Sequence, residues 1–209
     1  MTHPHASSQR PRLAVFISGG GRTLLNLHDR ILDGSLIAEI PLVVASKPCT
    51  GVDRALACGL HTIIMLGDIA ARDLAALLAE FRIDLVVLAG YLKLLPISKE
   101  LEGGVINIHP ALLPKYGGPG MYGHRVHEAV LAAGDTESGC TVHLCDNIYD
   151  RGEILLQRRC PVLADDTPHS LAARVFEQEL LAYPTAIKEL LKRVIGLPRD
   201  GRPASSQAS

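Results

Sequence analysis

Residues 13–23 read LAVFISGGGRT, and this stretch decides the fold. The apolar run Leu13 to Ile17 predicts a strand buried on both faces, and Gly19 to Gly21 predict a tight turn that opens a helix from about Thr23 to Leu32. In an open α/β sheet, such a turn presents backbone N–H groups and the positive end of a helix dipole, which suits a phosphate. A tight turn without any ligand is the simpler alternative.

The order of strand and helix repeats along the first half of the chain. Short apolar runs predict further strands at residues 40–45, 61–65, 85–89 and 105–108, and amphipathic spacing predicts helices over 52–58 and 70–81. This alternation predicts an α/β fold with a doubly wound, mostly parallel, Rossmann-like sheet that helices cover on both faces.

The second half of the chain has a different pattern. Extended runs at residues 140–145 and 153–162 predict a C-terminal antiparallel hairpin, and residues 167–195 predict a long terminal helix that Pro184 kinks or divides. We expect one domain over residues 13–197, between polar and disordered tails at 1–12 and 198–209.

Composition excludes several classes of protein. The 209 residues carry a net charge of −1 and are 47% hydrophobic, so the broad positive surface of a nucleic-acid binder is not expected. No run of about eighteen apolar residues is present, so neither a membrane span nor a membrane partner is expected. The first twelve residues lack the apolar core of a signal peptide. The five cysteines have no zinc-like spacing, and we interpret them as free thiols of a cytoplasmic protein.

Two side chains near the end of the fifth predicted strand are candidate catalytic residues. Asn107 and His109 stand two positions apart on an extended segment, so they point to the same side. An amide can donate to a developing oxyanion, and a protonated imidazole can donate a proton beside it, which acyl transfer needs. Asp150, in the turn Asp150-Arg151-Gly152, would raise the pKa of His109 and keep it an acid. The alternatives are a capped strand end and an ordinary Asp-x-Gly turn.

The remaining motifs do not predict a metal site, a covalent nucleophile or a dinucleotide-binding site. We interpret His143, which alternates with Val142 and Leu144, as structural, and His124 and His127 as the solvated or lid-facing side of a helix. No metal site and no covalent nucleophile are predicted. Leu24 stands where the third glycine of a dinucleotide fingerprint would fall, so that ligand is not expected.

Four segments resemble, in order, the phosphoribosylglycinamide formyltransferase family of folate-dependent enzymes. They are residues 17–21 (ISGGG), 85–95 (LVVLAGYLKLL), 107–116 (NIHPALLPKY), and 141–143 (TVH) followed by the turn Asp150-x-Gly152. The resemblance implies that 10-formyltetrahydrofolate donates a formyl group to the amine of 5′-phosphoribosylglycinamide in purine (IMP) biosynthesis, without a metal. It implies a monomer or homodimer whose partners are these two small molecules.

The resemblance also implies a role for particular residues. Asn107, His109 and Asp150 match the catalytic trio; Gly21, Arg22 and Thr23 match the phosphate site; Glu179 matches a residue at the glycinamide end; and Arg72, Leu92, Lys93, Leu94, Leu95 and Asn107 match the folate site. Residues 13–110 would form a phosphate-binding half and residues 111–197 a folate-binding and catalytic half.

Some positions depart from the family pattern. Arg22 adds a guanidinium near the phosphate, Lys93 stands where arginine is frequent, and Arg151 would weaken the effect of Asp150 if it turned inward. Formyltetrahydrofolate deformylase, in which water accepts the formyl group, is the nearest alternative enzyme. Methionyl-tRNA and sugar-nucleotide formyltransferases share the trio but fit this chain less well. A phosphosugar- or folate-binding protein without activity is the alternative from a different class.

Overall fold

The computed structural model describes residues 10–196. The tail predicted over 198–209 and most of the tail predicted over 1–12 lie outside that range. The first strand begins at Arg12, one residue before the predicted start of the domain.

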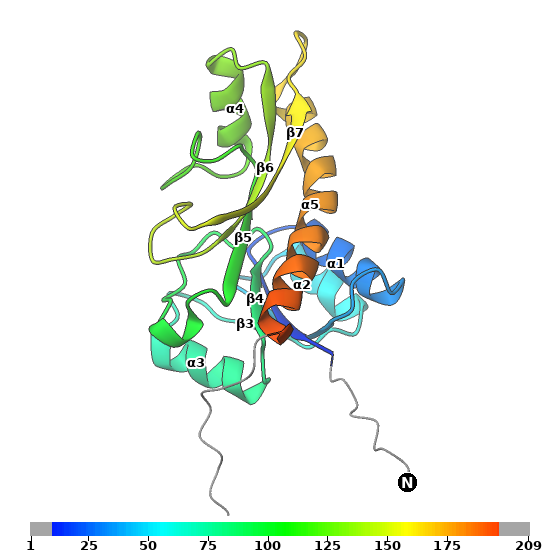
Figure 1. Cartoon of the computed structure of the whole chain (residues 1–209), viewed down its shortest axis with the longest axis vertical. Coiled ribbons are helices and arrows are strands. Elements are labelled where there is room, and N and C mark those ends of the chain that lie inside the picture. The colour runs from blue at the N-terminus through cyan, green and yellow to red at the C-terminus, as the bar shows by residue number, and fades with distance from the viewer. Residues whose placement is uncertain (1–9, 197–209) are drawn as a thin grey trace, which may run out of the picture.

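A seven-stranded sheet in the order β3-β2-β1-β4-β5-β6-β7 forms the centre of the molecule (Figure 1). Its strands are β1 (Arg12–Ile17), β2 (Glu39–Ala45), β3 (Thr62–Ile64), β4 (Leu85–Leu88), β5 (Val105–His109), β6 (Glu137–Leu144) and β7 (Ile154–Pro161). The pairs among β1 to β5 are parallel, whereas β6 pairs antiparallel with both β5 and β7. The predicted mostly parallel sheet with a C-terminal antiparallel hairpin is confirmed.

Helices cover both faces of the sheet. They are α1 (Arg22–Leu32), α2 (Thr50–Ala57), α3 (Ala71–Glu80), α4 (His124–Ala132) and α5 (Pro168–Gly196), with a short 3₁₀ turn at Lys99–Leu101. Alternate residues of β1 separate the two layers, because Val15 packs in one apolar cluster with α1 and α5 while Phe16 packs in another with α3. The strand is therefore apolar on both faces, as the run at 13–17 requires.

The terminal helix α5 is continuous through Pro184, so of the two predicted outcomes, a kink or a division, the division is excluded. In Figure 1 the helix runs along β6 and β7 and continues past α1 as one element. The neighbouring Tyr183 explains why the helix persists, because its ring is fully buried and its hydroxyl donates to the carbonyls of Leu88 and Ile106 at 2.9 and 3.1 Å. Tertiary contacts of this kind outweigh the backbone hydrogen bond that a proline removes.

The topology brings the predicted site residues to one edge of the sheet. The strands β1, β4 and β5 are adjacent and parallel, so the loops after their carboxyl ends lie side by side. The antiparallel partner β6 places His143 opposite Asn107 in the register. Within residues 10–196, none of the helices is both long and apolar enough to cross a membrane.

Candidate active site

The glycine turn after β1 forms the N-terminus of α1. Gly21 is the N-cap residue with φ of 69°, and a Cβ atom there would lie 2.9 Å from the Cα of Gly51. Glycine is therefore required at position 21 by the left-handed backbone and by the close approach of the first turn of α2. No side chain caps α1, and its first turn contains no acidic residue. The backbone N–H groups of the first turn of α1 therefore favour the binding of an anion at this end of the helix.

Ser18 connects this turn to two neighbouring loops. Its hydroxyl oxygen accepts a hydrogen bond from Ser46 Oγ at 2.7 Å and another from the backbone N–H of Leu92 at 3.0 Å. Ser18 is buried. The phosphate-suited turn and the loop after β4 are therefore joined by one side chain.

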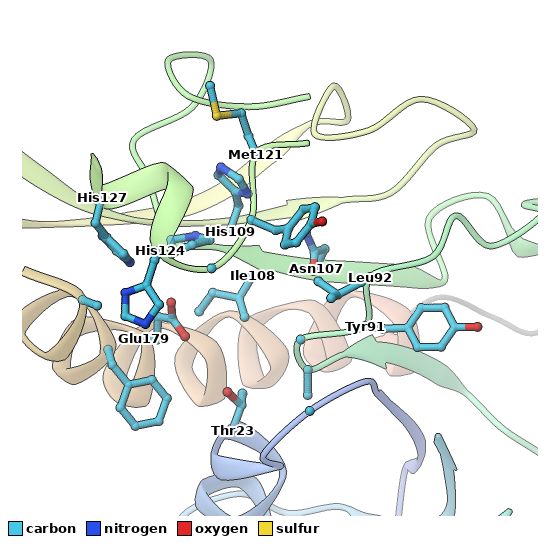
Figure 2. Close-up of a pocket in the computed structure, with 18 of the residues that line it drawn as sticks. Thr23, Tyr91, Leu92, Asn107, Ile108, His109, Met121, His124, His127 and Glu179 are labelled. Atoms are coloured by element: carbon cyan, nitrogen blue, oxygen red, sulfur yellow. The ribbon is translucent and has the colours of Figure 1, made fainter. Parts of the chain in front are cut away.

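A cavity of about 830 Å³ opens above the turn, at the carboxyl ends of β1, β4 and β5. Figure 2 shows Thr23 and Glu179 reaching it from α1 and α5, and His109, His124 and His127 facing them from the other wall. The predicted residues that line it are Gly21, Arg22, Thr23, Leu92, Asn107, His109, Asp150 and Glu179. The residues predicted for the phosphate, for the acceptor amine and for catalysis therefore line the same cavity.

A second, much smaller cavity of about 40 Å³ adjoins the first at Asn107. Lys93, Leu94 and Leu95 line it, together with the segment from Asp146 to Asp150. The Lys93 ammonium donates to the carbonyl of Gly67. The two cavities share Tyr91, Asn107, Tyr149 and Asp150. Arg72 lines neither cavity, and its side chain is 89% exposed near the start of α3, so the structure does not bring this predicted folate residue to the site.

His109 and Asp150 face each other as predicted. His109 Nδ1 lies 3.6 Å from Asp150 Oδ2, and the side chains are 4% and 8% exposed. On the other side of the ring, Nε2 lies 2.7 Å from the carbonyl oxygen of Tyr116 and can donate to it. Both nitrogens therefore face acceptors, an arrangement that only the protonated imidazole satisfies fully.

The predicted direction of the His109 pKa is nevertheless wrong. Burial lowers this pKa below its usual value, and this effect outweighs the opposing influence of Asp150 and of the Tyr116 carbonyl, while His143 adds to the lowering. Asp150 acts in the direction expected from the sequence, but the low exposure of the ring penalises its charged form more strongly.

Two strained backbone positions hold this arrangement. Tyr116 and Asp150, which flank His109, have φ values of 58° and 56°, in the left-handed region that side chains rarely adopt. The Tyr116 hydroxyl donates to Asp135 at 2.8 Å, and Asp150 Oδ2 accepts from the Gly118 N–H at 2.9 Å. Such strain costs about 1–3 kcal/mol per residue and is often found at functional sites.

Asp150 is ionised at neutral pH. Burial raises its pKa, but the hydrogen bond from His143, the charge of His109 and the Gly118 N–H outweigh that effect and hold the pKa below its usual value. Arg151 is exposed and lines neither cavity, so it does not turn inward toward this carboxylate.

His143, which we interpret from the sequence as structural, contacts two of the predicted catalytic residues. Its Nε2 lies 3.2 Å from Asn107 Nδ2 and 3.5 Å from Asp150 Oδ1. Its Nδ1 can donate to the Leu144 carbonyl at 2.8 Å. Nε2 accepts from the Asn107 amide when it carries no proton and donates to Asp150 when it carries one, so His143 can orient either side chain. The motif at 141–143 was the signal in the sequence, but only the register with β5 reveals the contact.

Glu179 and Arg22 both line the large cavity. Burial raises the pKa of Glu179 to about 8, although the Arg22 guanidinium partly opposes this shift. The Cζ atom of Arg22 lies 3.9 Å from the centre of the Phe176 ring, a close cation–π contact. Phe176, which the sequence did not single out, thus supports the cation nearest to the candidate phosphate site.

Of the two histidines of α4, His124 is exposed as predicted, whereas His127 is buried, so the prediction of a solvated surface is wrong for His127. His127 is 4% exposed, and both His124 and His127 line the large cavity. The ring of His124 stacks with that of His169 on α5, with centres 6.3 Å apart. Between residues 10 and 196, no group of three or more histidine, cysteine or acidic side chains is arranged to hold a metal ion.

The chain matches a known family over most of its length. The formyl transferase family model covers residues 11–187, so the chain belongs to the formyl transferase family. Similar curated proteins are called phosphoribosylglycinamide formyltransferase. The protein from Haemophilus influenzae is 34% identical over 85% of each chain. The chloroplastic protein from Vigna unguiculata is 41% identical over 93% of this chain, which spans 65% of that relative.

Solved structures agree with these relatives. Glycinamide ribonucleotide transformylase 1 from Symbiobacterium toebii superposes with a TM-score of 0.81 at 30% identity, covering 96% of both chains. Phosphoribosylglycinamide formyltransferase from Brucella melitensis has a TM-score of 0.78 at 36% identity, covering 92% of this chain and all of the other. A formyltetrahydrofolate deformylase from Pseudomonas syringae has a TM-score of 0.78 at 21% identity and shares the fold.

Proposed function

We propose that this chain transfers the formyl group of 10-formyltetrahydrofolate to the amine of 5′-phosphoribosylglycinamide, a reaction of purine (IMP) biosynthesis. The observation that carries the proposal is the position of Asn107, which lines both cavities while His109 and Asp150 stand beside it. Two ligands bound in the two cavities would meet at this amide. The named relatives and structures support the same reaction.

We assign one of the two substrates to each cavity. The acceptor phosphate would bind at Gly21, Arg22 and Thr23, where the N-terminus of α1 and a guanidinium supply positive charge. Its amine would lie toward Glu179. The donor would place its pterin between residues 92–95 and the segment 146–150. Leu92 lines the large cavity, and Lys93, Leu94 and Leu95 line the small one, which would have to widen from about 40 Å³ to admit the ring. Leu92 and Leu94 are exposed and offer apolar surface to such a ring. We do not assign Arg72 to this site.

The reaction follows from this placement. The acceptor amine attacks the formyl carbon, and the electron pair of the carbonyl bond moves to oxygen, where the Asn107 amide and the His109 imidazolium stabilise the oxyanion. On collapse, the bond between the formyl carbon and the folate nitrogen breaks. That nitrogen takes up one proton while the amine loses one, so the proton balance closes. Asp150 and the oxyanion both favour the charged form of His109, against the effect of burial.

A direct assay tests the proposal. Purified protein is mixed with 10-formyltetrahydrofolate and phosphoribosylglycinamide, and loss of the formyl donor and gain of formylated product are followed. We expect turnover only when the amine is present. Turnover with water alone would instead assign the deformylase reaction, and binding of both ligands without turnover would assign a binding protein.

Replacement of His109 separates catalysis from binding. We expect His109→Ala to lower formyl transfer by about 10² to 10⁴-fold, because it removes a charged donor from the oxyanion and the proton source. Folate binding should change little, measured by titration calorimetry. Equal loss of folate binding would make His109 a structural residue.

The compartment, the oligomeric state and the partners of the protein can also be proposed. We propose a cytoplasmic protein, a monomer or homodimer, that acts on these two small molecules without a nucleic-acid partner. The cysteines among the described residues are free thiols, which fits a reducing compartment, whereas the names of the plant relatives place those proteins in the chloroplast. We further propose that residues 13–197 form one domain, since a single sheet runs through both of its halves. Sedimentation equilibrium measures the oligomeric state.

A further inference from the structure

We propose that His127 is a binding residue for the ribose of the acceptor, and that its imidazole forms a hydrogen bond with a ribose hydroxyl. This inference rests on the proposed acceptor, phosphoribosylglycinamide. It concerns a side chain that takes no part in the chemistry described above.

The first observation is an imidazole buried without a partner. The side chain of His127 is 4% exposed, and its Nδ1 is sealed from solvent with no hydrogen-bond partner among the described residues. Nε2 is not sealed in this way, and the ring lines the large cavity. Because Nδ1 is sealed, a ligand in the cavity could reach only Nε2. No hydrogen bond to a described residue occupies Nε2, so this nitrogen is available to a ligand.

The second observation is the place of His127 within the cavity. Figure 2 shows the ring descending from α4 on the wall that also carries His124 and His109, with Glu179 and Thr23 on the opposite side. His127 lines the large cavity but not the small one, so its ligand is the acceptor and not the pterin. With the phosphate at Thr23 and the amine toward Glu179, the part of the acceptor between them is the ribose.

The chemistry of the ring fits a hydroxyl better than a charged group. Burial, together with the nearby His124 and His109, lowers the pKa of His127 to about 4, so the ring is neutral at physiological pH. With Nδ1 sealed, the neutral ring offers Nε2 as either a donor or an acceptor, and a sugar hydroxyl can pair with either. A phosphate would instead favour a cation, which the Arg22 side of the cavity supplies.

The test compares three variants by steady-state kinetics with both substrates. His127→Phe keeps a ring and removes its polar atoms, and we expect the acceptor KM to rise about tenfold while the donor KM stays within about twofold. His127→Gln restores a donor and an acceptor and should return the acceptor KM to within about threefold of the unchanged protein. His61→Phe, at an exposed histidine outside both cavities, is the matched control and should change neither constant.

An acceptor analogue sharpens the test. If one ribose hydroxyl is replaced by hydrogen, the unchanged protein should lose about tenfold in acceptor affinity, and His127→Phe should lose nothing further. An unchanged acceptor KM in His127→Phe would overturn the inference. So would equal changes in both KM values accompanied by a lower melting temperature, which would indicate a packing role. A wild-type protein that does not formylate the acceptor would overturn the proposed function, and this inference with it.

Discussion

Replacement of Asp150 by asparagine tests how the carboxylate sets the pKa of His109, the proposed catalytic imidazole. The variant keeps the size of the side chain and an oxygen that can accept from the Gly118 N–H, but it removes the negative charge 3.6 Å from His109 Nδ1. Because that charge stabilises the proton on His109, its removal lowers a pKa that burial has already depressed. The acid form of His109 then persists only at lower pH.

The size of the effect follows from the geometry. At 3.6 Å, and with an effective dielectric constant of about 20, two unit charges interact by about 4.6 kcal/mol, which is an upper limit for this pair. Measured effects of a nearby carboxylate on a pKa are about one to three units, and each unit corresponds to about 1.4 kcal/mol. We therefore expect the pKa of His109 to fall by about one to three units, and kcat at pH above that value to fall by about 10- to 1000-fold.

Two measurements check this prediction. The His109 pKa is followed by NMR titration of its ring protons, and kcat for formyl transfer is recorded against pH. The falling limb of the pH profile should move to lower pH by the same amount as the pKa. Asp146→Asn removes a carboxylate from the same segment, but Asp146 is exposed and accepts from the Ile148 N–H, so this control should leave the His109 pKa unchanged. An Asp150→Asn variant with an unchanged or raised His109 pKa would refute the reasoning.

Three further changes have defined outcomes. Phe176→Leu removes the ring 3.9 Å from the Arg22 guanidinium, so the acceptor KM should rise by about two- to thirtyfold with the donor KM unchanged. Glu179 has its pKa raised from 4.5 to about 8, so the stability that this group contributes is present below about pH 4.5 and is lost as the pH rises through about 8. Glu179→Gln does not titrate, so its melting temperature should rise relative to that of the unchanged protein between about pH 5 and pH 9. Tyr183→Phe removes the buried hydroxyl that bonds the Leu88 carbonyl, and urea unfolding should show a loss of about 1–3 kcal/mol.

The fold was predictable because its signals are local. A run such as Leu13 to Ile17 is apolar without interruption only where a strand is covered on both faces, and the helices between such runs carry one apolar stripe. Pro184 shows the limit of this reasoning. A proline is a helix-breaking signal in the sequence, but the buried Tyr183 beside it holds α5 against the sheet.

The candidate site was predictable only in part, because several of its properties arise from tertiary contacts. Asn107 and His109 could be paired from their spacing, but the contact of His143 depends on the register between β5 and β6. Strand alternation alone gives no information about a neighbouring strand. The lowered pKa of His109 depends on burial by distant segments, and the burial of His127 depends on α4 packing beside α5. Neither quantity can be read from nearby residues.

The side chain of Ser18 has a consequence for how the two substrates affect each other. Its hydroxyl joins the turn after β1, where we propose that the acceptor phosphate binds, to the backbone of Leu92, which we propose for the donor site. Thermodynamic linkage is reciprocal: if the donor tightens acceptor binding by ordering Leu92, the acceptor must tighten donor binding by the same factor. Ser18→Ala would then reduce by the same amount the factor by which each substrate tightens the binding of the other. The cooperativity between the substrates would depend on this one hydroxyl.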